Sequence, residues 1–88
     1  MQVIRKATTA GGRETYTFGA LGSCFLVKNM TGAAITVNIL DASVVIPANT
    51  AQMVVTRLTP TISDMTNTVE IVGQENNELG VEVQCLDY

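Results

Sequence analysis

Apolar and polar residues alternate with a period of two along most of this chain, and that alternation restricts the fold more than any other feature of the sequence. In "ITVNIL" (35–40), Ile35, Val37 and Ile39 fall on one face and polar residues fall between them. This is the side-chain pattern of a half-buried β-strand. No segment has the i, i+3, i+4, i+7 apolar spacing of an amphipathic helix. The sequence therefore predicts an all-β protein.

The number and spacing of the alternating segments indicate the architecture. The chain has 88 residues, enough for one domain. Turn-forming residues separate the segments at intervals of about eight to twelve positions, a spacing typical of sandwiches and small barrels. We expect a single domain over residues 1–88, built as a small antiparallel β-sandwich or jelly roll of about seven to eight short strands. Local pattern does not specify strand order, and we favour a sandwich.

The segments that flank Gly11 and Gly12 predict a β-hairpin. Adjacent glycines can take the positive φ angles of a two-residue turn, and "VIRKATTA" and "RETYTFGA" on either side have strand-like composition. In that register Arg5 lies opposite Phe18, a pairing that suits a sheet edge better than a deep core. Because the N-terminal residues also have low apolar content, we expect residues 1–12 to form an arm that is either flexible or exchanged between subunits.

A second interruption lies within "SVVIPANTAQMVV" (43–55). Pro47 cannot donate a ladder hydrogen bond and should end the first strand, and Asn49 tolerates the left-handed conformation that a chain reversal needs. In the strand that follows, Met53 and Val55 share one face while Val54 lies on the other. Apolar residues on both faces predict a strand that is covered twice, by the opposite sheet and by another subunit.

The residue inventory argues against enzymatic activity. Histidine is absent, which removes the commonest general base and both the Ser-His-Asp and the Cys-His arrangements. No glycine motif opens a helix as a phosphate loop does, and only Cys24 and Cys85 could supply thiolates to zinc. We therefore expect a protein that is not an enzyme and that binds no cofactor or metal.

Charge and hydropathy restrict the partners. The formal net charge is −3, whereas nucleic-acid binding depends on a basic patch. No apolar run approaches the roughly 18–20 residues of a membrane span. Charged residues form 15% of the chain, against about 25% in ordinary soluble domains, and such a surface is less protected against association. We expect no nucleic acid and no membrane as partners, and a homo-oligomer.

Three short motifs each allow a structural and a functional interpretation. Cys24 and Cys85 lie in strand-like segments, and we favour two buried thiols over a disulfide bridge. The triplet "NMT" at Asn29 matches a glycosylation sequon, which we interpret as accidental. The acidic loops "GQENNELG" (73–80) and "SDMTN" (63–67) offer oxygen ligands for weak calcium binding, but for these we favour solvated turns.

Few residues are available to form a subunit interface. Aromatic residues are scarce, which also leaves little surface for stacking on sugar rings. Phe25 is expected in the core. The candidate interface residues are Arg5, Tyr16, Phe18, Met53, Leu86 and Tyr88.

The segments "FLVKNMTGAAITVNIL" and "VVIPANTAQMVV" together resemble small β-sandwich structural proteins of tailed bacteriophages, such as capsid decoration proteins, auxiliary capsid proteins and head-fibre bases. The similarity covers residues 25–55 and consists of turns and β-branched strands. Bacterial Ig-like adhesion modules share parts of it. The resemblance implies binding to a repetitive virion surface as an oligomer, and it transfers no catalytic or ligand-binding residue.

Two functions follow as hypotheses. The first is a non-enzymatic structural protein of the virion, assembled in the host cytoplasm, that decorates or reinforces a capsid or an attached head or tail structure. Its partners would be further copies of itself and the major capsid protein or another virion protein. The alternative is a monomeric glycan- or peptide-binding Ig-like module of a bacterial surface system.

Overall fold

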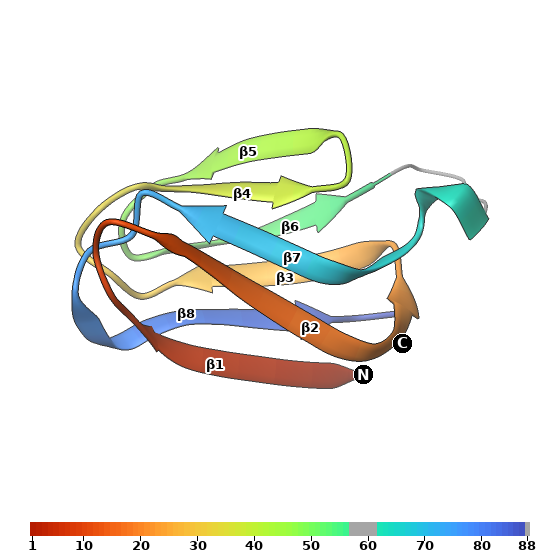
Figure 1. Ribbon diagram of the computed structural model, residues 1–88, viewed down its shortest axis with the longest axis horizontal. Helices are drawn as coiled ribbons and strands as arrows, with labels where there is room; N and C mark the ends of the chain where they lie inside the picture. Colours follow the sequence, from red (N-terminus) through yellow and green to blue (C-terminus); the bar gives the residue numbers. More distant parts are fainter. Residues whose placement is uncertain (57–61, 88) are drawn as a thin grey trace.

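The computed structural model describes residues 1–56 and 62–87 and contains eight strands and one short 3₁₀ helix (Figure 1). The strands are β1 (Gln2–Thr8), β2 (Arg13–Gly22), β3 (Cys24–Asn29), β4 (Ile35–Ile39), β5 (Ala42–Ile46), β6 (Thr50–Val55), β7 (Thr66–Val72) and β8 (Asn77–Cys85). The helix η1 covers Ile62–Asp64. This confirms the predicted all-β architecture.

The strands form two four-stranded antiparallel sheets that pack as a sandwich. Sheet A has the order β1-β8-β3-β6 and sheet B the order β2-β7-β4-β5. The first strand therefore pairs with the last, the second with the seventh, the third with the sixth and the fourth with the fifth. Every connection except β4–β5 crosses from one sheet to the other. This is the strand order of a jelly roll.

The core lies between the two sheets and is built from the inward-facing half of each alternating segment. The predicted inward face of 35–39 is confirmed, and 69–71 and 81–85 bury alternate residues in the same way. The Tyr16 phenol is buried and satisfied, because it donates its hydroxyl to the carbonyl of Val81 in the opposite sheet (3.0 Å). The buried hydrophobic residues are Tyr16, Phe18, Phe25, Val27, Ile35, Val37, Ile39, Ile46, Val54, Val69, Ile71, Val81, Val83 and Cys85.

The predicted hairpin around Gly11 and Gly12 is wrong. Gly11 does have a positive φ of 85°, but the chain crosses between sheets at this turn, so that β1 pairs with β8 and β2 with β7. Arg5 lies opposite Glu82 rather than Phe18, and the Phe18 ring packs in the core 5.9 Å from that of Phe25. The alternation of apolar and polar residues is the same whether β1 and β2 form a hairpin or lie in different sheets. Only the second arrangement lets both strands face one core between the sheets.

The N-terminal segment belongs to the sandwich. Residues 2–8, which we expected to be flexible or exchanged, form β1, and this strand pairs with β8 of the same chain from Gln2 to Thr8. β1 is an edge strand, as the expected pairing of Arg5 with Phe18 indicated, but it pairs with β8 rather than with β2. Ile4 on its inner side packs against the core.

Asn29 is a buried hub that joins three segments at one end of the sandwich. Its side chain is 1% exposed and donates to the carbonyls of Ala33 (2.8 Å), Ile46 (3.2 Å) and Pro47 (3.1 Å). Its Oδ1 accepts from the amide (3.1 Å) and the hydroxyl (2.7 Å) of Thr31. The amide nitrogen that a glycan would occupy is thus committed inside the fold, which agrees with an accidental sequon.

The Pro47 interruption links the sheets. Asn49 adopts the predicted left-handed conformation with φ of 55°, and its amide donates to the carbonyl of Thr31 (3.1 Å). The chain leaves β5 in sheet B and enters β6 in sheet A, so the turn lies at the end of the sandwich and next to the Asn29 hub.

The β1–β8 pairing contains a bulge that depends on Gly80. The register shifts between Lys6 and Thr8, and Gly80 has a φ of 63°. A Cβ atom at this position would collide with the backbone carbonyl of Lys6 and lie 2.9 Å from the Cα of Ala7. Asn77 supports the bulge by accepting from the amide of Gly80 (3.2 Å).

We predict that Gly80→Ala lowers the free energy of unfolding by about 3 kcal/mol or more, because it adds left-handed strain to a backbone collision. Gly12→Ala is the matched control, since a Cβ at Gly12 meets no atom within 4 Å. It should change stability by less than about 1 kcal/mol. Urea denaturation followed by circular dichroism measures both. Equal losses would show that the bulge adapts to a side chain.

We also predict that Asn29→Ala lowers the free energy of unfolding by about 3 kcal/mol or more, because it leaves several buried backbone groups without a partner. Asn38→Ala serves as the control. Asn38 is half-buried and donates one hydrogen bond, to Glu70 (3.2 Å). The Asn38→Ala variant should therefore lower the free energy of unfolding by only about 1 kcal/mol. Similar values for the two variants in urea titrations would contradict the role of Asn29 as a hub.

Candidate functional site

The outer face of sheet A carries two cross-strand rows of mainly apolar side chains. One row runs over all four strands through Val3, Gln84, Leu26 and Met53. In the next row Cys24 lies opposite Val55. Leu86, just after β8, continues this row by donating its amide to the carbonyl of Cys24 (2.9 Å).

Several of these side chains are exposed although they are large and apolar. Val3 is 46% exposed, Met53 56% and Val55 41%. The other members are half-buried. Apolar side chains that gather on one face and are bordered by polar residues form a candidate interaction surface. We call this surface the apolar face; it consists of Val3, Cys24, Leu26, Met53, Val55 and Leu86.

A row of charges borders the apolar face. Arg5, Glu82 and Lys28 follow one another across β1, β8 and β3, and the Lys28 Nζ lies 3.4 Å from the Glu82 carboxylate. A hydrogen bond from Gln84 and the charges of Lys28 and Arg5 lower the pKa of Glu82. Because positive and negative side chains alternate in this row, the border is polar and neighbouring charges offset one another.

A shallow pocket of about 350 Å³ lies beyond this charged row, at the end of sheet A. Lys28 and Ala51 form its side toward the sheet, and Leu79, which is 58% exposed, contributes further apolar surface. The charged row separates this pocket from the apolar face, and the pocket has room for an apolar side chain of a partner. Its remaining lining residues are Asn29, Met30, Asn49 and Thr50.

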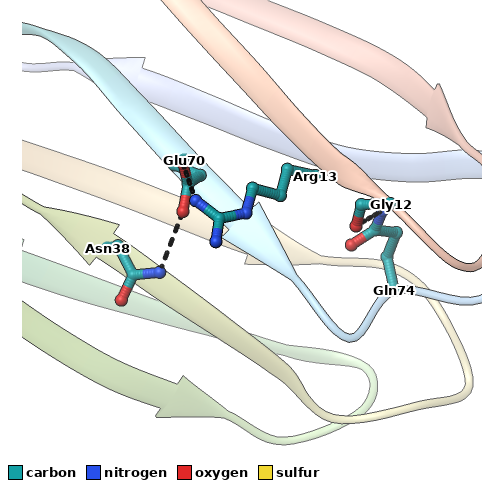
Figure 2. A network of polar contacts seen from close by, with 5 residues as sticks. All are labelled: Gly12, Arg13, Asn38, Glu70 and Gln74. Carbon is teal, nitrogen blue, oxygen red and sulfur yellow. Dashed lines mark hydrogen bonds and ion pairs between the residues drawn. The ribbon is translucent and has the colours of Figure 1, made fainter.

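The outer face of sheet B is mainly polar by contrast, although Val45 on its edge strand β5 is 62% exposed. At its centre Glu70 accepts hydrogen bonds from Arg13 (3.4 Å) and Asn38 (3.2 Å) (Figure 2). Figure 2 also shows Gln74 donating to the carbonyl of Gly12 (2.8 Å), which fixes the β1–β2 turn against the end of β7. The two faces of the sandwich therefore differ in kind.

The structure separates the predicted interface residues into two groups. Arg5, Met53 and Leu86 come together on or beside the apolar face. Tyr16 and Phe18 are 0% and 3% exposed, so they fill the core and present no surface to a partner. They were misplaced because the predicted hairpin put them on an open ribbon.

Tyr88 lies outside the described residues. Sequence reasoning missed Val3 and Leu26 as members of the apolar face. The signal for Leu26 was present in "CFLV", where apolar residues occupy both faces of one strand, as they do in "QMVV". Val3 could be assigned to the apolar face only once the pairing of β1 with β8 was known.

The cluster richest in reactive groups surrounds Asp87. Its carboxylate accepts from the amide (3.0 Å) and hydroxyl (2.6 Å) of Ser23 and from the amide of Cys24 (3.1 Å). Burial raises the pKa of Asp87, but these hydrogen bonds outweigh it and lower the pKa below its ordinary value of 3.8. Burial, together with the Asp87 charge, raises the pKa of both the Cys24 and the Cys85 thiols. Protonated thiols are weak nucleophiles. The hydrogen bonds from Ser23 and Cys24 to Asp87 instead hold the C-terminal segment in place, and we call this contact the clamp.

The two cysteines point to opposite sides of sheet A. Cys85 is paired with Phe25 and both are buried in the core, whereas Cys24 precedes Phe25 and lies on the outer side. Both are free thiols, Cys85 buried and Cys24 half-buried. Because successive side chains of a strand alternate, no rotamer brings the two sulfur atoms together.

The acidic loop at 73–80 uses its oxygen atoms to hold the fold. Glu75 accepts from the amide of Gly32 (2.8 Å), Asn76 from that of Ala10 (2.8 Å) and Asn77 from that of Leu79 (2.9 Å). Within residues 1–56 and 62–87, no group of three or more acidic, Cys or His side chains is arranged to hold a metal ion. The same residues include no helix of the length and hydropathy needed to cross a bilayer.

Comparisons of the chain with protein-family models, with curated proteins and with solved structures found no match.

We predict that the stabilisation by Asp87 is lost in acid. Because the pKa of Asp87 in the folded state lies below 3.8, its contribution is present above that pH and disappears as the pH falls through the folded-state pKa. Asp87→Asn should therefore have a lower thermal midpoint than the wild type at neutral pH, with a gap that narrows as the pH falls below 3.8. Circular dichroism melts across this pH range test it.

Glu78→Gln removes one negative charge from an exposed side chain and is the control for the Asp87 experiment. Its midpoint should follow that of the wild type at every pH. A constant gap between wild type and Asp87→Asn down to the lowest pH would contradict the clamp.

Proposed function

We propose that this protein is a non-enzymatic structural component of a virion that docks onto a capsid surface through its apolar face. The cross-strand row in which Leu26 lies beside the exposed Met53, with the exposed Val3 on the far side of Gln84, carries the proposal. Burying such side chains contributes about 25 cal/mol for each Å² removed from water. On a repetitive surface, many copies would each bury the same small patch.

The fold is compatible with this role. Jelly rolls occur in viral capsid domains, and also in lectins and cupins, so the fold by itself does not assign the function. The distribution of aromatic residues separates these possibilities. Tyr16, Phe18 and Phe25 are all buried in the core and present no ring to a sugar, whereas lectin sites commonly stack sugars on exposed aromatic side chains. This favours a protein partner over a glycan.

The charges also favour a protein surface as the partner. The charged row beside the apolar face contains Arg5, Glu82 and Lys28 in alternating sign, which is suited to fixing the orientation of a protein partner at the rim of an interface. The formal net charge of −3 gives no attraction to the phosphates of packaged nucleic acid.

We predict that the double variant Val3→Thr/Val55→Thr binds capsids at least about tenfold more weakly than the wild type, because two apolar contacts become hydroxyl-bearing ones of the same shape. The probe is a tailed-phage capsid assembled from purified major capsid protein, and co-sedimentation measures bound protein. Both positions are exposed, so the fold should be retained, as circular dichroism can check.

Val45→Thr is the matched control, since Val45 is 62% exposed on the polar sheet B. It should bind capsids as the wild type does. Wild-type protein that ignores the capsids, or equal binding by all three proteins, would overturn the proposal. Binding of an isolated glycan by a protein that ignores capsids would support the alternative module of a bacterial surface.

A further inference from the structure

The two open sides of the sandwich are protected to different extents. On one side the edge strands β1 and β2 are bridged by side chains. Gln2 accepts from the amide of Gly19 (2.9 Å), and Lys6 donates to the carbonyl of Thr15 (2.6 Å) with its ammonium 5.1 Å from the Tyr16 ring centroid. Both edge strands also carry charges and register shifts, which are the usual means of blocking edge pairing.

The other open side, formed by β5 and β6, has none of these features. Residues 42–56 contain no Asp, Glu, Lys or Arg, and both strands pair with their neighbours without a bulge. No side-chain hydrogen bond bridges the two strands within residues 1–56 and 62–87. A flat, uncharged edge of this kind is a template for pairing with another strand.

The backbone groups that β6 presents at this edge follow from its register. The amide of Thr56 donates to the carbonyl of Ser23 (2.9 Å). Hydrogen-bonded pairs alternate along an antiparallel ladder, so the even-numbered residues of β6 bond to β3. Ala51, Met53 and Val55 therefore direct their N–H and C=O groups away from sheet A, to the edge.

We propose that β6 pairs antiparallel with β6 of a second copy of this chain about a two-fold axis, with Met53 of one copy opposite Met53 of the other. In this register Ala51 lies opposite Val55 on either side of the axis. All three edge-facing residues of each strand are then satisfied by about six backbone hydrogen bonds. The two A sheets become one eight-stranded sheet.

A second copy fits this edge for reasons of polarity and charge. The apolar pair of Leu26 and Met53 continues across the axis into the same pair of the other copy, so the two apolar faces join into one surface. No charged side chain of β6 meets its equivalent across the axis. A contact limited to one strand lies at the small end of interface sizes, so we expect a weak, concentration-dependent dimer that capsid docking reinforces by avidity.

This inference deepens the proposed function by naming the contact between copies, but it does not depend on capsid binding. The apolar face is tested by co-sedimentation with capsids, and the β6 edge is tested on the isolated protein. Either experiment can therefore fail without the other.

The test is sedimentation velocity across a range of concentrations on the full chain and on two charge variants. Met53→Lys and Met53→Glu each place like charges opposite one another across the axis, and each should weaken the dimer at least about tenfold. An equimolar mixture of the two variants places Lys opposite Glu and should restore association. Because Met53 is exposed, both variants should keep the wild-type circular dichroism spectrum.

Val3→Lys is the control, since it makes the same change on the same face at the opposite edge strand. It should associate as the wild type does. A wild type that stays monomeric, equal weakening by Val3→Lys, or a mixture that fails to associate would each overturn the proposal. Weakening confined to the Met53 variants, with rescue in the mixture, would support it.

Discussion

The antiparallel pairing of β8 with both β1 and β3 is the constraint on which the sandwich depends. β8 is the last strand of the chain, yet it occupies an interior position in sheet A. Within the described residues β1 pairs with β8 alone, and the buried Tyr16 hydroxyl finds its acceptor on Val81. These contacts join the two ends of the sequence, so the entropy of closing the chain is offset only when both ends are in place. The fold is therefore one cooperative unit in which the N-terminal segment is not a separable arm.

The sequence predicted which way side chains face far better than which strands are neighbours. The alternation in 35–39 is a local property, and the structure confirms it. Strand pairing is not local, because Gly11 can turn the chain within a sheet or across the sandwich with the same left-handed φ. The wrong choice at this turn placed Tyr16 and Phe18 on a surface, and it hid Val3 from the candidate site. Met53 was found because an apolar residue on the outer side of a strand is itself a local signal.

The apolar face and the β6 edge follow from one property of the chain, which is that β3 and β6 carry apolar residues on both of their sides. Sheet B follows the ordinary rule, with polar residues such as Glu70 outside and Ile71 inside. Sheet A departs from it where β3 and β6 lie side by side. On sheet B the exposed Val45 is the exception, so the outer face of sheet A is the more apolar of the two.

The placement of Cys24 and Cys85 on opposite sides of one sheet bears on the environments in which this domain can fold. Since the sulfur atoms cannot meet within the chain, the sandwich owes none of its stability to a covalent cross-link. Its free energy of unfolding should not depend on the thiol–disulfide redox potential of its surroundings. The domain can then be synthesised in a reducing cytoplasm and persist outside the cell without a maturation step at either cysteine.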